Sequence, residues 1–145
     1  MQGLHLTADL MGCAAAQPIM HDARALAALC RHAVGRSGLE SVGEAFHGFA
    51  PGGAGVTGVL LLAESHLAIH TWPELGAVTI DVYVCNLGAD NSARARALMH
   101  RLIDAFAPAN VERHELRRGA ALAPQAAATR SPAPVPSVNA SSKTE

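Results

Sequence analysis

In the segment from Ala77 to Cys85, apolar side chains alternate strictly with side chains that carry a hydroxyl, carboxyl or thiol group from Val78 onward. The apolar positions are Val78, Ile80, Val82 and Val84, and those between them are Thr79, Asp81, Tyr83 and Cys85. A period of two predicts a β-strand with two unlike faces. The apolar face should pack against helices, whereas an acid, a phenol and a thiol on the other face suit a functional site better than a core.

Two segments show helical periodicity instead. The first is expected between Asp22, as N-cap, and the terminating glycines at 35 and 38. The second follows Asn91 or Ser92, has apolar residues at i, i+3, i+4, i+7, i+8 and i+11 from Ala95, and ends at Pro108.

Further extended segments are expected at residues 3–10, 39–49, 56–63, 66–70 and 111–117, with turns at 51–55 and 73–76. The continuous apolar run 56–63 is typical of a strand buried on both faces. The polar segment 111–117 suits a sheet edge. This element order predicts an α+β fold, a two-layer sandwich in which helices pack on one face of a mainly antiparallel sheet.

The composition limits the number of domains and the kinds of partner that the chain can have. We expect one domain over residues 1–119 and a disordered Ala/Pro/Ser-rich tail over 120–145. A net charge of -1 gives no basic field for nucleic acid or a membrane surface, and no apolar run is long enough to span a membrane. Three widely spaced cysteines indicate a reducing, cytoplasmic compartment.

Residues 63–74 gather the reactive groups. Ser65 follows Glu64, His66 and His70 are four apart, and Cys85 lies on the next strand. A hydroxyl, an imidazole and a thiol can serve as nucleophile, base and proton donor, although each is also common as a surface or core residue. Two histidines four apart bind metal on a helix, but on a strand with no third ligand in the segment we expect no metal site.

The order and spacing of Ser65, His70, Thr71-Trp72-Pro73-Glu74 and Cys85 resemble the prokaryotic S-adenosylmethionine decarboxylase proenzymes. The resemblance covers roughly residues 3–118. It implies a pyruvoyl-dependent enzyme, paired as a homo-oligomer, that decarboxylates S-adenosylmethionine to the aminopropyl donor for spermidine biosynthesis.

The resemblance also implies roles for the reactive residues. Ser65 would attack the carbonyl of Glu64 and cut the chain into a β chain, 1–64, and an α chain, 65–145. Ser65 would then become the pyruvoyl group, which forms a Schiff base with the substrate. His70 would be the proton acceptor in this processing, and Cys85 the proton donor in catalysis.

Three more positions match the family. Thr57, in the motif Gly55-Val56-Thr57-Gly58, would support processing, Glu74 would bind the ribose hydroxyls, and Phe49 would stack on adenine.

The sequence also departs from the family pattern. Leu75, Ala77 and Asn86 stand where the family commonly has tyrosines and a glycine, near the expected substrate site. The same chemistry on arginine or ornithine therefore stays open, with Asp81 or Glu74 holding the distal cation. A non-processing dimeric binding module is a third interpretation, which the presence of Ser65, His70 and Cys85 disfavours.

Overall fold

The computed structural model describes residues 2–49 and 55–119. In chain order the elements are β1 (Gly3–Met11), α1 (Pro18–His21), α2 (Ala23–Arg36), β2 (Gly43–Gly48), β3 (Val56–Leu62), β4 (Ser65–Trp72), the 3-10 turn η1 (Pro73–Leu75), β5 (Ala77–Cys85), α3 (Ser92–Phe106) and β6 (Asn110–Arg118). The predicted order of strands and helices is confirmed, and the short α1 and η1 are additions to it.

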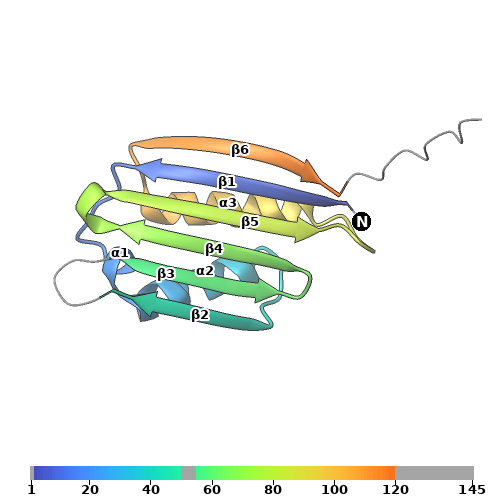
Figure 1. The fold of residues 1–145 in the computed structure, drawn as a ribbon, viewed down its shortest axis with the longest axis horizontal. Helices are drawn as coiled ribbons and strands as arrows, with labels where there is room; N and C mark the ends of the chain where they lie inside the picture. The colour runs from blue at the N-terminus through green and yellow to red at the C-terminus, as the bar shows by residue number, and fades with distance from the viewer. Residues whose placement is uncertain (1, 50–54, 120–145) are drawn as a thin grey trace, which may run out of the picture.

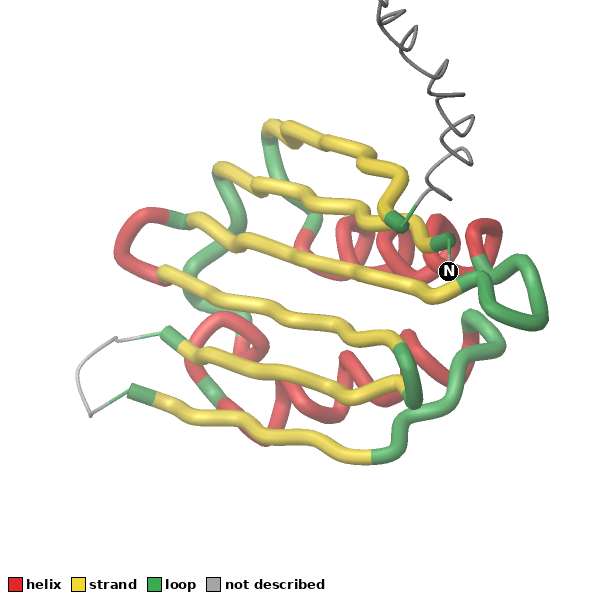
Figure 2. The backbone as a smooth tube through the Cα atoms, turned by 45° about the vertical axis from the view of Figure 1, so that its right-hand side comes forward, coloured by secondary structure: helices red, strands yellow, loops and turns green. Residues whose placement is uncertain are grey.

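The strands form one six-stranded sheet in the order β2-β3-β4-β5-β1-β6. Every neighbouring pair is antiparallel. The helices lie behind the sheet on one face, and no described element covers the other (Figure 1, Figure 2). The predicted two-layer α+β architecture is confirmed, with β6 at an edge as its polar sequence indicates.

Alternation along the central strands separates a helix face from an open face. The apolar residues of β1 and β5 on the helix face are buried: Leu4, Leu6, Ala8, Leu10, Val78, Ile80, Val82 and Val84. Between them, His5, Thr7, Asp81 and Tyr83 face the open side and are partly exposed. The strand predicted from the Ala77–Cys85 pattern is confirmed, together with the packing of its apolar side on helices.

The long helices begin largely where the sequence indicates. The Asp22 carboxylate accepts hydrogen bonds from the backbone N–H groups of Arg24 and Ala25, at 2.7 and 3.3 Å, and so caps α2. Gly35 lies inside α2 and does not end it, whereas Gly38 follows the helix with a φ of 72°. The buried residues of α3 are the predicted stripe: Ala95, Leu98, Met99, Leu102, Ile103 and Phe106.

The expectation that residues 56–63 form a strand buried on both faces is wrong. Val56, Leu60 and Leu62 are buried on the helix face, but Thr57, Val59 and Leu61 face the open side, where Leu61 is 52% exposed. An apolar run indicates only that both faces are apolar. Here one of them is left uncovered within the single chain.

The remaining expectations concern the extent of one strand, a turn and the tail. The strand expected at 66–70 is longer, since β4 runs from Ser65 to Trp72. Most of the turn expected at 51–55, and the whole tail 120–145, lie outside the described residues. Among the described helices, none has the length and apolar character needed to cross a membrane.

Candidate active site

The predicted cleavage point lies in the tight turn between β3 and β4. Leu62 pairs with Ser65 across this turn, so that Ala63 and Glu64 form its two-residue loop. Ala63 has a φ of 53°, in the left-handed region that costs a residue with a Cβ about 1–2 kcal/mol. Two-residue hairpin loops require positive φ, and the strand pairing therefore imposes this strain. The Glu64–Ser65 bond therefore lies directly after a strained residue in a tight turn.

Ser65 lies against the end of β5. The backbone N–H of Cys85 donates a hydrogen bond to Ser65 Oγ at 3.0 Å. Cys85 is buried, with 6% of its surface exposed. The fold thus brings together two of the predicted catalytic residues.

An open cavity of about 550 Å³ is lined by Cys85 and by Glu64 and His66, the residues on either side of Ser65 in the chain. Its lining includes Glu64, His66, Tyr83, Cys85, Leu87 and Arg118. The guanidinium of Arg118 lies over the Tyr83 ring, 5.4 Å from its centre, a cation–π arrangement. The cavity therefore offers a cation and an aromatic ring next to Glu64, the residue whose carbonyl Ser65 would attack. We call this region the Ser65 end of the sheet.

His70 and Thr57 form a second group. They are directly opposite each other on β4 and β3, and Thr57 Oγ1 lies 3.0 Å from His70 Nδ1. Glu74 follows in η1, and Phe49 comes just after β2 with its ring 4.9 Å from that of His47. We call this region the His70 end of the sheet.

The two ends are far apart within one chain. His70 comes five residues after Ser65 on an extended strand, which separates their Cα atoms by about 17 Å. In Figure 1 the β3–β4 turn and the end of β5 lie at the right of the sheet, and η1 lies at the left. The structure brings Ser65 to Cys85 and Thr57 to His70, but it does not bring His70 to Ser65.

Two glycines of the Gly55–Gly58 motif have steric reasons of their own. A Cβ on Gly55 would collide with the backbone carbonyl of Thr71, and one on Gly58 would collide with the Phe46 ring. The motif therefore lets β3 approach its neighbours closely enough for Thr57 to reach His70.

Thr71 is a residue whose part the sequence reasoning missed. Its side chain is buried, its Oγ1 donates to the carbonyl of Met20 at 2.7 Å, and it accepts from the backbone N–H of Val56 at 2.8 Å. One hydroxyl thus ties α1 to β3 and β4 next to His70. A threonine inside the Thr-Trp-Pro-Glu stretch was the only signal, and it does not reveal partners that lie 51 and 15 residues away.

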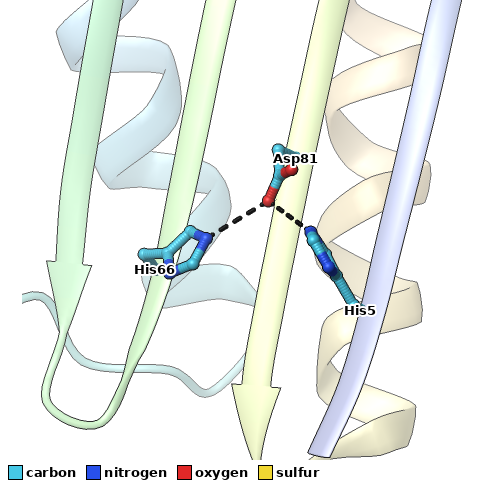
Figure 3. Close-up of side chains that lie close together, drawn as sticks. All are labelled: His5, His66 and Asp81. Atoms are coloured by element: carbon cyan, nitrogen blue, oxygen red, sulfur yellow. Dashed lines mark hydrogen bonds and ion pairs between the residues drawn. The ribbon is translucent and has the colours of Figure 1, made fainter. Parts of the chain in front are cut away.

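Asp81 also has a specific environment. Nε2 of His5 and Nε2 of His66 lie 2.7 and 3.2 Å from the same carboxylate oxygen, Oδ1 (Figure 3). Within its own segment, His66 has His70 as a further possible metal ligand. The fold supplies two from other strands, and the other histidine is not His70.

The remaining cysteines belong to the core. Burial raises the pKa of the Cys30 thiol to about 12, with Glu44 acting in the same direction and Arg31 opposing it. Burial also raises the pKa of Cys13. Both thiols lie in the hydrophobic core, whereas Cys85 lines the cavity, which leaves Cys85 as the cysteine at the site.

Comparison with known proteins agrees with this geometry. Residues 4–119 match the family model described as S-adenosylmethionine decarboxylase. The S-adenosylmethionine decarboxylase proenzyme of Moorella thermoacetica is 37% identical over 87% of this chain and 94% of its own length. That of Picrophilus torridus is 36% identical over 81% and 84%.

A solved structure shares the fold. The crystal structure of the adenosylmethionine decarboxylase from Aquifex aeolicus matches with a TM-score of 0.72 and 35% identity, over 81% of this chain and 91% of that one. The resemblance seen in the sequence is thereby confirmed over nearly the same residues. This chain belongs to the S-adenosylmethionine decarboxylase family.

Proposed function

We propose that this chain is a pyruvoyl-dependent decarboxylase of S-adenosylmethionine that first cuts itself between Glu64 and Ser65. The observation that carries the proposal is the Ser65 end of the sheet. There a serine hydroxyl is held by Cys85 in a strained turn, beside an open cavity, in a chain of this family.

The turn geometry supports the cutting step. Ser65 Oγ attacks the carbonyl of the preceding residue, Glu64, and the peptide becomes an ester. The strain at Ala63 is present before the attack, and the part of it that is relieved as the peptide rearranges toward the ester lowers the barrier. The N–H of Cys85 keeps the hydroxyl in place.

The residues present fit a pyruvoyl group at position 65. The oxygen of such a group can accept the hydrogen bond from the Cys85 N–H that Ser65 Oγ accepts now. A pyruvoyl group supplies a carbonyl that binds the substrate amine and withdraws electrons as carbon dioxide leaves. The Cys85 thiol, one residue position away across the strand pair, then returns a proton to the substrate carbon.

The placement of His70 points to a second copy of the chain. His70, Thr57, Phe49 and Glu74 cannot reach Ser65 in the same chain, because they lie at the opposite end of the sheet. Two copies related by a two-fold axis, with their open faces together, bring the His70 end of one chain to the Ser65 end of the other, twice. In that arrangement His70 accepts the proton of the other copy's Ser65, supported by Thr57.

The open face has the character of such an interface. It carries exposed apolar side chains on four different strands: Met11, Leu61, Trp72 and Leu116, each between 36% and 59% exposed. Exposed apolar groups spread over a whole sheet face favour a covering partner. Phe49 and Glu74 of the second copy would then reach the cavity to hold adenine and ribose.

The other interpretations are not favoured. Asp81, considered above as a carboxylate for a distal cation of arginine or ornithine, already contacts two histidines. The relatives described above are named for S-adenosylmethionine, and nothing at the site favours a non-processing module. Three free cysteines suit a reducing compartment, so we place the enzyme in the cytoplasm.

The test has two stages. The denatured mass of the purified protein should show two chains that divide between Glu64 and Ser65, with a pyruvoyl group on the second, and the Ser65→Ala variant should stay whole. The cut protein should then release carbon dioxide from S-adenosylmethionine and not from arginine or ornithine. A wild-type chain that stays whole would contradict the processing, and release from another amino acid alone would contradict the substrate.

A further inference from the structure

Three side chains on the open face of the sheet direct metal-binding atoms at one point (Figure 3). His5 comes from β1 and His66 from β4, and Asp81 comes from β5, which lies between them. The two Nε2 atoms and the Asp81 oxygen all lie within 4.8 Å of one another. None of these side chains takes part in the proposed cutting or decarboxylation.

The register of the sheet makes this convergence rigid. Tyr83 on β5 pairs with His5 on one side and with His66 on the other. The imidazole rings lie 6.0 and 5.7 Å from its phenol ring, which restricts their rotation. Asp81 is two residues earlier on β5 and therefore on the same face. The ligand atoms are thus held together before any ion arrives, which lowers the entropic cost of binding.

Two of the three separations between ligand atoms, those that involve Asp81 Oδ1, are near the values of a tetrahedral site. Zinc bonds to nitrogen and oxygen of about 2.0–2.2 Å place neighbouring ligand atoms about 3.3 Å apart. The separation of His66 Nε2 and Asp81 Oδ1, 3.2 Å, already has this value. His5 Nε2, now 2.7 Å from the same oxygen, needs to withdraw by about 0.6 Å, a small side-chain adjustment.

The donor set indicates the class of ion. Two imidazoles and one carboxylate suit Zn²⁺ and the neighbouring transition metals, whereas Mg²⁺ and Ca²⁺ prefer oxygen ligands. Without an ion, two Nε2–H groups donate to one carboxylate oxygen. A divalent cation replaces both protons and attracts the carboxylate more strongly.

We propose that His5, His66 and Asp81 form a binding site for a divalent transition-metal ion, with Zn²⁺ as the best fit. In the single chain these side chains are 19%, 39% and 38% exposed, and His66 also lines the cavity at the Ser65 end, which gives an ion a route to the site. The bound ion joins β1, β4 and β5, the central strands of the sheet, next to the cavity at the Ser65 end.

Zinc binding is measured on the Ser65→Ala chain, stripped with a chelator, so that the result depends on neither cutting nor decarboxylation. We expect one Zn²⁺ per chain by calorimetry and a higher unfolding temperature in its presence. With Co²⁺ in place of Zn²⁺, we expect the visible absorption of a tetrahedral site. His66→Ala and Asp81→Asn should each weaken Zn²⁺ binding more than about tenfold, since even a hydrogen-bond partner of a ligand is worth about 10–100-fold.

His114→Ala is the matched control. His114 lies on the same open face, opposite Thr7, and its Nε2 is 3.1 Å from Oε1 of Glu112. It forms a histidine–carboxylate pair outside the three-residue cluster, so its loss should leave the Zn²⁺ affinity unchanged. Circular dichroism checks the fold, and the isosteric Asp81→Asn carries the test where His66→Ala does not fold. Absence of Zn²⁺ binding, or full affinity in Asp81→Asn, overturns the proposal.

Discussion

The backbone N–H of Cys85 donates a hydrogen bond to Oγ of Ser65 across 3.0 Å, although the two residues lie 20 positions apart. The contact fixes the start of β4 against the end of β5. It also separates two contributions of one residue, because the main chain of Cys85 holds the serine while its thiol is left for the substrate. The two contributions can therefore be tested independently.

Replacing Cys85 by alanine should allow cutting but impair decarboxylation. The N–H donor belongs to the backbone and survives the substitution, so Ser65 stays in place. Loss of a general acid costs about 10²–10⁴-fold in turnover. Intact mass measures the cutting, and carbon dioxide release measures turnover. Cys30→Ala, in the core, is the control that should keep both, and full turnover in Cys85→Ala would exclude the thiol as proton donor.

Replacing Ala63 by glycine should slow the cutting. Glycine adopts the observed φ of 53° without a Cβ penalty, so the strain of about 1 kcal/mol is no longer available to the reaction. This corresponds to about a fivefold slower rate, followed as the fraction of whole chain against time after synthesis. Ala68→Gly, in the middle of β4, is a control for glycine itself. An unchanged rate in Ala63→Gly would show that the strain does not drive the step.

Local patterns in the sequence predict much of this fold. The alternation of β5, the stripe of α3, the N-cap Asp22 and the polar edge strand β6 each depend on neighbours within a few residues, and each is confirmed. The spacing of Ser65, His70 and Cys85 likewise indicates the family. Short-range periodicity carries this information because it reflects the face that each element buries.

Local patterns in the sequence do not predict how the strands are arranged relative to one another. The pairing of His5 with the strand that carries Asp81 follows from sheet order, which no local pattern contains. The apolar run of β3 indicates two apolar faces but not that one stays open in the single chain. The 17 Å or so between Ser65 and His70 follows from simple strand geometry, yet their nearness in the sequence hides it.

Replacing Thr71 by valine should destabilise the fold. The buried hydroxyl serves both the carbonyl of Met20 and the N–H of Val56, and valine leaves both without this partner. We expect a loss of about 1–3 kcal/mol in the free energy of unfolding, measured with urea. Thr79→Val, on the open face of β5, makes the same chemical change and should cost less than about 0.5 kcal/mol. Equal costs for the two variants would refute the role of the Thr71 hydroxyl.

The free energy of unfolding should fall at alkaline pH because the Cys30 thiol is buried. Its thiol pKa is raised from 9.0 to about 12 in the fold, chiefly by burial, so the native state keeps a proton that the unfolded chain loses. The resulting stabilisation is complete below about pH 9 and is lost as the pH rises toward about 12. The urea midpoints of the wild type and of Cys30→Ala should therefore converge as the pH rises from about 7.5 to about 10.5. A constant difference would contradict the linkage.

Mixing two inactive variants should restore cutting if His70 acts on the other copy. His70→Ala keeps the serine but lacks the base, and Ser65→Ala keeps the base but lacks the nucleophile. In a mixed pair, His70 of the Ser65→Ala chain faces Ser65 of the His70→Ala chain. Since random pairing places about half of the chains in mixed pairs, up to about half of the His70→Ala chains should be cut.

The two variants are expressed together and distinguished by mass, so that the cut chain is identified directly. The control replaces the Ser65→Ala partner with the Ser65→Ala, His70→Ala double variant, which offers the same surface without the imidazole and should give no cutting. Rescue by the first partner and not by the second assigns the base to the neighbouring chain. Equal cutting with both partners, or rapid cutting of His70→Ala alone, would show that His70 is not the base, because Ser65 would then be cut with no imidazole at position 70. Strand geometry, which keeps His70 about 17 Å from Ser65 of its own chain, is the reason to expect neither outcome.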